Sequence, residues 1–243
     1  MMKQSNIKER PIIFNAAMVH SILEGRKSQT RRVIKPQPSE HWKPYCFCEV
    51  DKMVDGVITD IPIGWGVSNE WGDEAYKFPY GEKGDELWVR ETCRAEELED
   101  GLDGVRYLAD DFFKSIENSQ EAMEDWFHLY GYAGKRGAKV PSIHMPRWAS
   151  RIQLKIKNVR VERLQDISEA DAKAEGLKYH NLYKEWGGVE PHPASRPDCP
   201  QWRWYTRPKD AFQYLWQFIN GEDSWDSNPW VWVVDFSMIS GRL

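Results

Sequence analysis

A lysine, two hydroxyl residues and three arginines lie within the seven positions from Arg26 to Arg32. Because cations this close together repel one another, the neutral amine of Lys27 is favoured and its pKa should be lowered. A neutral amine can act as a general base, and Thr30 lies three positions on, close enough to meet it on one turn. The segment therefore predicts either a binding site for an anion or a catalytic lysine.

Cleavage of an amide bond needs a nucleophile, a base for it, and positive groups where oxyanion charge develops. Thr30 supplies a hydroxyl nucleophile, Lys27 a base, and the neighbouring arginines positive charge. The plainer alternative is a solvated basic loop followed by a strand that contains Thr30. The residue types alone favour that alternative.

Short apolar segments and helix signals predict the elements that would position this segment. Asn15 suits a helix N-cap, Gly25 suits its end, and Ser168 with Asp171 resembles a capping box. The expected elements are a strand at 11–14, a helix at 15–24, a strand at 86–91, a helix near 120–130, one long bent strand or two at 152–161, a short helix ending at Gly176, a helix from Pro208 to Gly221 and a strand at 229–236.

Strands mixed with a few helices, without a βαβ rhythm, predict an α+β fold built on a small curved sheet or barrel. The length suits one domain over residues 1–243, with an ample core. We expect that core in segments 11–35, 82–93, 141–176 and 208–239, with irregular insertions at 36–81, 94–140 and 177–207.

Charge is segregated along the chain. The net charge of −5 argues against a general nucleic-acid coat protein. Residues 95–125 have eleven acids and two bases, whereas residues 135–163 have nine bases and one acid. Such blocks are either solvated faces or a local anion-binding surface.

The composition predicts a cytoplasmic protein without a membrane segment. No stretch approaches the ~20 apolar residues of a membrane span, and the first residues lack the apolar region of a secretory signal. Four cysteines do not make a disulfide framework, and the C-x-C pair at 46 and 48 has poor spacing for zinc. We expect no metal site and no cofactor. The 13 tryptophans suit either a core or aromatic walls around flat ligands.

Several motifs occur in a fixed order among these elements: G-R-K-S-Q-T-R-R at 25–32, G-D-E-L-W-V at 84–89, L-Q-D-I-S-E-A-D-A-K-A-E-G at 164–176 and V-W-V-V-D-F at 231–236. Together they resemble the ASCH domain family, whose fold is a PUA-like β-barrel. The strings P-S-I-H-M-P-R-W-A-S-R-I at 141–152 and N-P-W-V-W-V-V at 228–234 are similar to those of its phage and prophage branch. The resemblance covers the four core segments and not the insertions.

Small bacterial ASCH proteins include an amidohydrolase that removes the acetyl group from N4-acetylcytidine. The resemblance places its catalytic lysine, threonine and glutamate at Lys27, Thr30 and Glu175, and its nearby arginine at Arg32. Glu175 would orient the lysine or the leaving amine. Two features depart from that enzyme: this chain is more than twice as long, and Ser28 offers a second hydroxyl. The remaining candidates for substrate or nucleic-acid binding are Arg26, Ser28, Arg31, His144, Arg147, Trp148 and Arg151.

Three functions remain open. The first is hydrolysis of an N-acylated pyrimidine nucleoside in a pocket that holds Lys27, Thr30 and Glu175. The second is a non-catalytic module that binds RNA or a modified base, with the basic strand at 151–163 on phosphates. The third is a phage accessory factor that binds a host protein through its acidic segment, 95–125.

Overall fold

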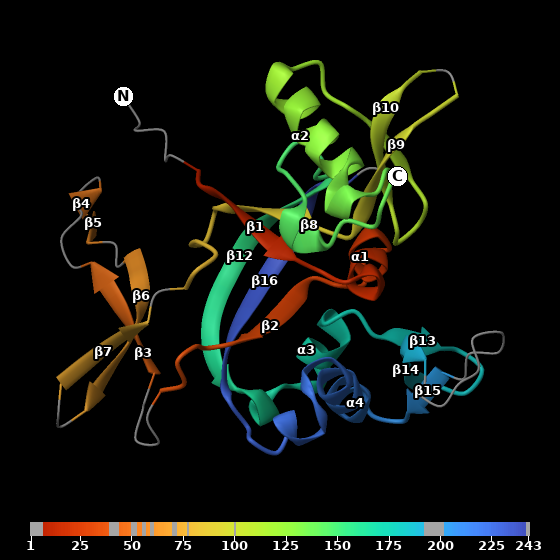
Figure 1. The fold of residues 1–243 in the computed structure, drawn as a ribbon. Helices are drawn as coiled ribbons and strands as arrows, with labels where there is room; N and C mark the ends of the chain where they lie inside the picture. Colours follow the sequence, from red (N-terminus) through yellow and green to blue (C-terminus); the bar gives the residue numbers. More distant parts are fainter. Residues whose placement is uncertain are drawn as a thin grey trace.

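The protein is described here by a computed structural model that covers residues 7–38, 44–49, 53–54, 57–58, 61–69, 72–76, 78–99, 101–191 and 202–241. Four α-helices and several separate β-sheets make up these residues, so the fold is α+β as predicted. A curved central sheet lies in the middle, and three smaller units surround it (Figure 1).

The central sheet contains five strands in the order β1 (Glu9–Ile13), β8 (Glu86–Arg90), β12 (Ile152–Arg163), β16 (Trp230–Gly241) and β2 (Gln29–Val33). The first pair is parallel and the others are antiparallel. β12 is a single strand whose pairing with β16 contains two register shifts. This is the long bent strand that the sequence left as one of two possibilities, and its bulges add to the curvature of the sheet.

The predicted closure into a barrel is wrong for the described strands, because β1 and β2 remain the two edges of an open sheet. Closure requires a continuous ladder of backbone hydrogen bonds between the edge strands. Here the helix α1 (Ala16–Leu23) connects them, and a side chain bridges the gap. Arg32 Nη2 on β2 donates to the carbonyl oxygen of Ile13 on β1 at 2.6 Å.

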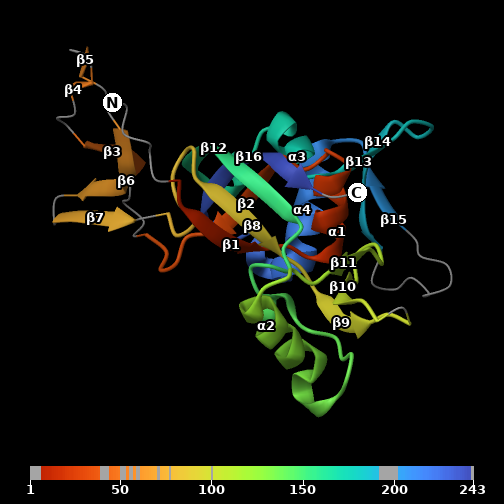
Figure 2. The ribbon, with the colours of Figure 1, turned by 90° about the horizontal axis from the view of Figure 1, so that it is seen from above.

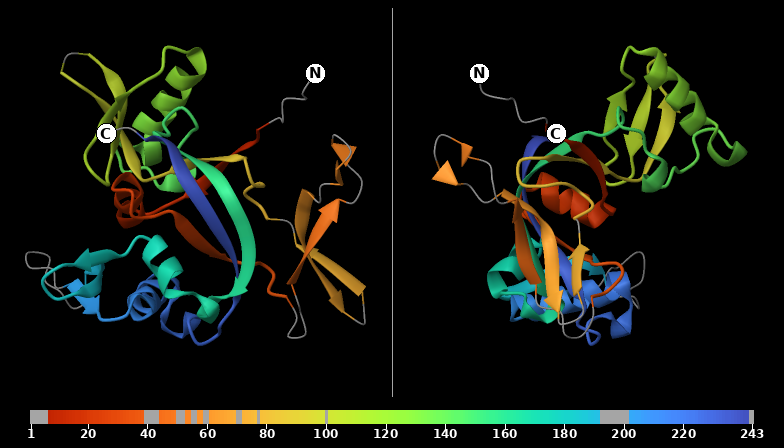
Figure 3. Two further views of the ribbon diagram at one scale, coloured as in Figure 1. Left: turned by 180° about the vertical axis from the view of Figure 1, so that it is seen from behind. Right: turned by 90° about the vertical axis from the view of Figure 1, so that its left-hand side faces the viewer.

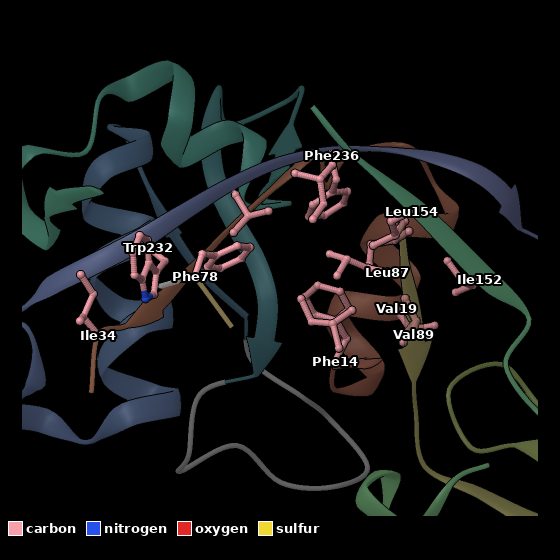
Figure 4. Close-up of a cluster of buried hydrophobic side chains, with 14 of the residues drawn as sticks. Phe14, Val19, Ile34, Phe78, Leu87, Val89, Ile152, Leu154, Trp232 and Phe236 are labelled. Atoms are coloured by element: carbon pink, nitrogen blue, oxygen red, sulfur yellow. The ribbon is translucent and has the colours of Figure 1, made fainter. Parts of the chain in front are cut away.

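One face of the central sheet and α1 enclose the main core (Figure 4). Alternate residues of each strand point to this face, as the two-residue period of a strand requires. The rings of Phe14 and Phe236 lie 6.1 Å apart in this core, and Phe78 contacts Trp232 at 5.4 Å. The aliphatic members include Ile12, Val19, Ile22, Ile34, Leu87, Val89, Ile152, Leu154, Ile156 and Val234.

The other face of the sheet packs against α3 (Glu169–Ala174) and α4 (Pro208–Asn220). Phe212, Leu215 and Trp216 of α4 are buried there, at the helical spacing that the sequence shows, whereas Ile219 is exposed. Gly221 ends α4 at a φ of 101°. The sequence therefore located this helix and its buried side correctly, apart from one position.

The three predicted insertions contain regular strands, so the prediction that they are irregular is wrong. Their bounds are β3 (Pro44–Glu49), β4 (Met53–Val54), β5 (Val57–Ile58), β6 (Ile61–Asn69) and β7 (Gly72–Tyr76) in the first, β9 (Cys93–Glu97), β10 (Asp103–Tyr107) and β11 (Phe113–Ser115) in the second, and β13 (Lys178–His180), β14 (Glu185–Pro191) and β15 (Trp202–Tyr205) in the third. Glycines and prolines within β6 and β14 mask the alternation that would identify these strands, so pairing with neighbours decides their structure.

The second insertion also contains α2 (Gln120–Tyr130), as predicted. This helix packs against β9 and β10 around a separate buried cluster that includes Tyr107, Trp126 and Trp148. Figures 2 and 3 show α2 with its small sheet on one side of the central sheet, away from both β13–β15 and the β3–β7 unit. Buried core residues therefore occur in all three insertions, as Phe78, Tyr107 and Leu177 show.

Candidate functional site

The segment 26–32 begins where α1 ends. Asn15 accepts a hydrogen bond from the backbone of Met18 at the start of this helix, and Gly25 follows its end with a φ of 72°. The backbone N–H groups of Arg26 and Lys27 both donate to the carbonyl oxygen of Ser21 at 2.9 Å. The chain therefore turns sharply and enters β2 with Lys27 directed inward.

The end of α3 lies beside this turn. The backbones of Lys27 and Glu175 form an isolated antiparallel bridge, and Ser28 N donates to the carbonyl oxygen of Ala174 at 2.9 Å. Gly176 has a φ of 103°, and a Cβ atom there would lie 2.8 Å from the Cβ of Ser21 and 3.0 Å from that of Lys27. A glycine is therefore required for the two segments to approach so closely.

This approach brings the Lys27 amine against the Glu175 carboxylate. Lys27 Nζ donates to Glu175 Oε2 at 2.7 Å and to the carbonyl oxygen of the same residue at 2.9 Å. Arg31 Nη1 donates to the other carboxylate oxygen at 3.2 Å. The side chains of Lys27, Arg31 and Glu175 are only 1%, 0% and 5% exposed. One buried carboxylate is thus held between two buried cations.

Burial lowers the pKa of Lys27, because the charged amine loses its hydration. Glu175 opposes this effect, and the charges of Arg32 and Arg31 add to it. The predicted direction is confirmed, but the main cause is burial, whereas the sequence suggested crowding by arginines. Arg26 plays no part in it, since its guanidinium bonds to Glu24 and to the carbonyl oxygen of Gly176.

Thr30 is 1% exposed and lies on β2 opposite Val234. Its side chain is on the same face of the strand as that of Arg32, two residues on. Among the described residues, the Thr30 hydroxyl has no hydrogen-bond partner. The fold therefore joins Lys27 directly to Glu175, and it places Thr30 nearby without a hydrogen bond to either side chain.

A cavity of about 350 Å³ lies along β2 between α1 and α4. Its volume is within the range of small-molecule sites. The lining residues are Met18, Thr30, Arg31, Arg32, Val33, Lys35, Tyr80, Glu175, Phe212, Leu215, Trp216, Ile219 and Asn220. Thr30 and Glu175 therefore face a common space, while Lys27 lies behind Glu175.

The Arg31 guanidinium also contacts polar side chains other than Glu175. Its Nη2 atom lies 3.2 Å from Glu162 Oε2 and 3.4 Å from Asp171 Oδ2, and its Nη1 atom donates to the Gln29 side chain. Arg160 bonds to the same two carboxylates and to Asp235. Burial alone would raise the pKa of Asp171, but the bond from Gln29 and the two arginines lower it. Both terminal nitrogens of Arg31 are thus engaged with protein groups.

Arg32 has fewer polar partners than Arg31. Besides the hydrogen bond to Ile13, its guanidinium lies 5.2 Å from the centre of the Phe14 ring. No described carboxylate lies within ion-pair distance of it. Burial lowers the pKa of Arg32, as expected for a cation without a counterion.

His144, Arg147, Trp148 and Arg151 do not line this cavity, although the sequence assigned them to binding. His144 is exposed beside Tyr132, and Arg147 Nε donates to Glu9 Oε2 at 2.8 Å. Trp148 is buried in the cluster below α2. Arg147 and Trp148 instead line a second cavity beside α2, where Glu117, Glu121 and Asp125 are also present.

Arg151 is a structural residue by its contacts. Its Nε and Nη2 atoms donate to both oxygens of Glu91 at 2.7 and 2.8 Å, and its Nη1 atom donates to Asp110 Oδ2 at 2.7 Å. The guanidinium also lies 4.0 Å from the centre of the Tyr107 ring. This buried cluster connects the central sheet to the α2 unit, and each guanidinium nitrogen of Arg151 already donates to a carboxylate. Burial raises the pKa of Glu91 despite this pairing.

Sequence reasoning missed Tyr80, Lys35 and the cavity side of α4. Tyr80 lies in a predicted irregular insertion, where no pattern pointed to a ligand. Trp216 carried the helical period of a core residue, and it is indeed buried while also lining the cavity. The candidate Ser28 is exposed and lies outside the cavity lining, so Thr30 is the hydroxyl that faces the site.

The described residues contain no group of three or more His, Cys, Asp or Glu side chains that could hold a metal ion. The side chains of Cys46 and Cys48, the C-x-C pair, lie outside the described part of the chain. Among the described helices, none combines the length and apolar character needed to cross a bilayer.

Comparisons with protein-family models, with curated proteins and with solved structures found no match to this chain.

Proposed function

We propose that this chain is an ASCH-type, PUA-like protein of phage or prophage origin that acts in the cytoplasm on a nucleoside or nucleic-acid base. In this proposal its cavity hydrolyses an N-acyl amide of the N4-acetylcytidine type. The observation that carries the proposal is the buried contact of Lys27 with Glu175 behind a cavity that Thr30 lines. The motif resemblance supports the same three residues.

The proposed reaction begins with attack of the Thr30 hydroxyl on the acyl carbon. Lys27 takes the hydroxyl proton, which its lowered pKa favours. The resulting ammonium stabilises the oxyanion of the tetrahedral intermediate. When the C–N bond breaks, that proton moves to the leaving amine, and water then releases the acid from the acylated threonine. Glu175 holds the amine of Lys27 throughout, so we regard it as a positioning residue.

One observation favours a second candidate, a non-catalytic module that binds a base. The Thr30 hydroxyl has no hydrogen-bond partner among the described residues, whereas an activated nucleophile usually contacts its base. Binding of long RNA through β12 receives little support, because Arg151 and Arg160 are already paired with acids. A base-binding module would therefore recognise its ligand within the cavity.

Incubation of the purified protein with N4-acetylcytidine tests the hydrolase directly. The expected products are cytidine and acetate, separated by liquid chromatography, and Lys27→Ala should abolish their formation. A thermal melt of the variant verifies that it is folded. Substrate that stays intact in the presence of folded wild-type protein removes the hydrolase, and binding of cytidine under those conditions would support the module instead.

A further inference from the structure

The charges on the cavity wall are unevenly compensated. Glu175 is the one acidic side chain among the described lining residues, and Lys27 and Arg31 already neutralise it. Arg31 in turn contacts three carboxylates, those of Glu162, Asp171 and Glu175. These groups form a closed network of two cations and three carboxylates, so both cations of the network are already paired with acids of the protein.

Within the part of the chain that the structure describes, Arg32 and Lys35 remain as cations without a counterion. Arg32 uses one terminal nitrogen on the carbonyl oxygen of Ile13, and the other, Nη1, has no hydrogen-bond partner among the described residues. Lys35 is exposed, and its amine forms no ion pair within the described part of the chain. The Tyr80 hydroxyl, which also lines the cavity, likewise lacks a described partner. A partly buried cation without a counterion is costly, so the cavity favours an anion beside Arg32.

The α4 side of the cavity suits a flat ring. Phe212, Leu215 and Trp216 of α4 form an apolar wall there. β2 is an edge strand of the central sheet. Its even-numbered residues form the backbone hydrogen bonds to β16, since Phe236 N donates to Ser28 O and Ile34 N donates to Trp230 O. The backbone N–H and C=O groups of Arg31 and Val33 therefore point to the free edge. They can bind the polar edge of a heterocycle.

We infer that the ligand of this cavity carries a phosphate group, bound by Arg32 and Lys35, and that its base lies between α4 and the edge of β2. The substrate class is thus a nucleoside monophosphate in preference to a free nucleoside. The position of the base rests on the proposed function. The phosphate site rests on the uncompensated cations alone.

Equilibrium binding of cytidine, cytidine 5′-monophosphate and inorganic phosphate, measured by calorimetry at low salt, tests this inference. We expect the monophosphate to bind at least tenfold more tightly than cytidine, and inorganic phosphate to compete with it. The preference should shrink as salt is added, since it comes from charge. Equal affinities for cytidine and its monophosphate would overturn the inference.

Two variants locate the effect. Lys35→Gln removes an exposed side chain and should leave the fold intact, while Arg32→Gln retains a donor for Ile13. Each should reduce the preference for the monophosphate by at least threefold, mainly through weaker binding of the monophosphate. Lys139→Gln is the matched control, because Lys139 is exposed and lies outside the cavity lining. A preference that survives both cavity variants would also overturn the inference.

These outcomes separate the inference from the proposed function. Phosphate binding that depends on Lys35 supports the phosphate site even if N4-acetylcytidine is never hydrolysed. Hydrolysis of the nucleoside without any preference for a monophosphate supports the function and contradicts the phosphate site.

Discussion

The Lys27 amine lies 2.7 Å from Glu175 Oε2, although 148 positions separate the two residues in the chain. The contact joins the start of β2 to the end of α3, and Gly176 is the residue that allows this approach. Because both side chains are buried, the pair affects the stability of the fold as well as the chemistry of the cavity.

Loss of Glu175 and loss of Lys27 should destabilise the protein by different amounts. Glu175→Gln leaves two buried cations without their carboxylate, so the free energy of unfolding should fall by about 3–5 kcal/mol. Lys27→Met should cost less, because Arg31 still holds Glu175. The double variant should lose less than the sum of the two, and urea unfolding followed by circular dichroism measures all three. Strict additivity would show that the pair is not coupled.

The lowered pKa of Lys27 predicts a pH dependence of stability. Between that lowered value and about 10.5 in the unfolded chain, the unfolded state binds more protons than the folded state. The free energy of unfolding should therefore rise with pH across this window, and below it the cost of charging Lys27 should stay constant. Unfolding curves from pH 7 to 10 should show this rise for wild type relative to Lys27→Met. Parallel curves would contradict the lowered pKa.

Gly176→Ala should damage the site as well as the fold. The new methyl group would meet Ser21 and Lys27, and alanine is strained at a φ of 103°. We expect a loss of about 1–3 kcal/mol from the strain, together with displacement of Glu175 from Lys27. Gly25→Ala is the control, because its φ is also positive but no atom lies within 4 Å of the added methyl group. Equal losses in the two variants would argue against close packing at Gly176.

Arg151→Gln should lower the free energy of unfolding without a specific effect on ligand binding in the cavity. Arg151 and Glu91 are buried, so loss of the cation should cost about 3–5 kcal/mol. Arg147→Gln breaks a pair that is largely exposed and should cost less than about 1 kcal/mol. Thermal melts compare the two variants. A change in ligand affinity at a temperature where the Arg151 variant is fully folded would restore a binding role for this residue.

The elements next to the site were predictable because their signals are local. Asn15, Ser168 and Pro208 mark helix starts, and Gly25 and Gly176 mark the ends of two helices. The strands of the insertions were not predictable, since their alternation is interrupted by glycine and proline and their stability depends on pairing. The open edge of β2 also could not be read from the sequence, because it depends on which strands meet in space.

Part of the candidate site could also be predicted from the sequence. The motif resemblance pointed to Lys27, Thr30 and Glu175, and the contact of the first with the third is present. The sequence could not distinguish Arg151, which is buried with two acids, from Arg32, which lines the cavity and has no carboxylate partner among the described residues. Both are arginines in basic segments, and only their three-dimensional neighbours separate a structural cation from one that a ligand can use.

The central claim is that Thr30 performs chemistry in the cavity. The most direct measurement is the rate of acetate release from N4-acetylcytidine by wild type, Thr30→Ser and Thr30→Val. The account predicts release by wild type, partial activity in Thr30→Ser, and a loss of at least about 100-fold in Thr30→Val with cytidine binding unchanged. Release by Thr30→Val at the wild-type rate would contradict it.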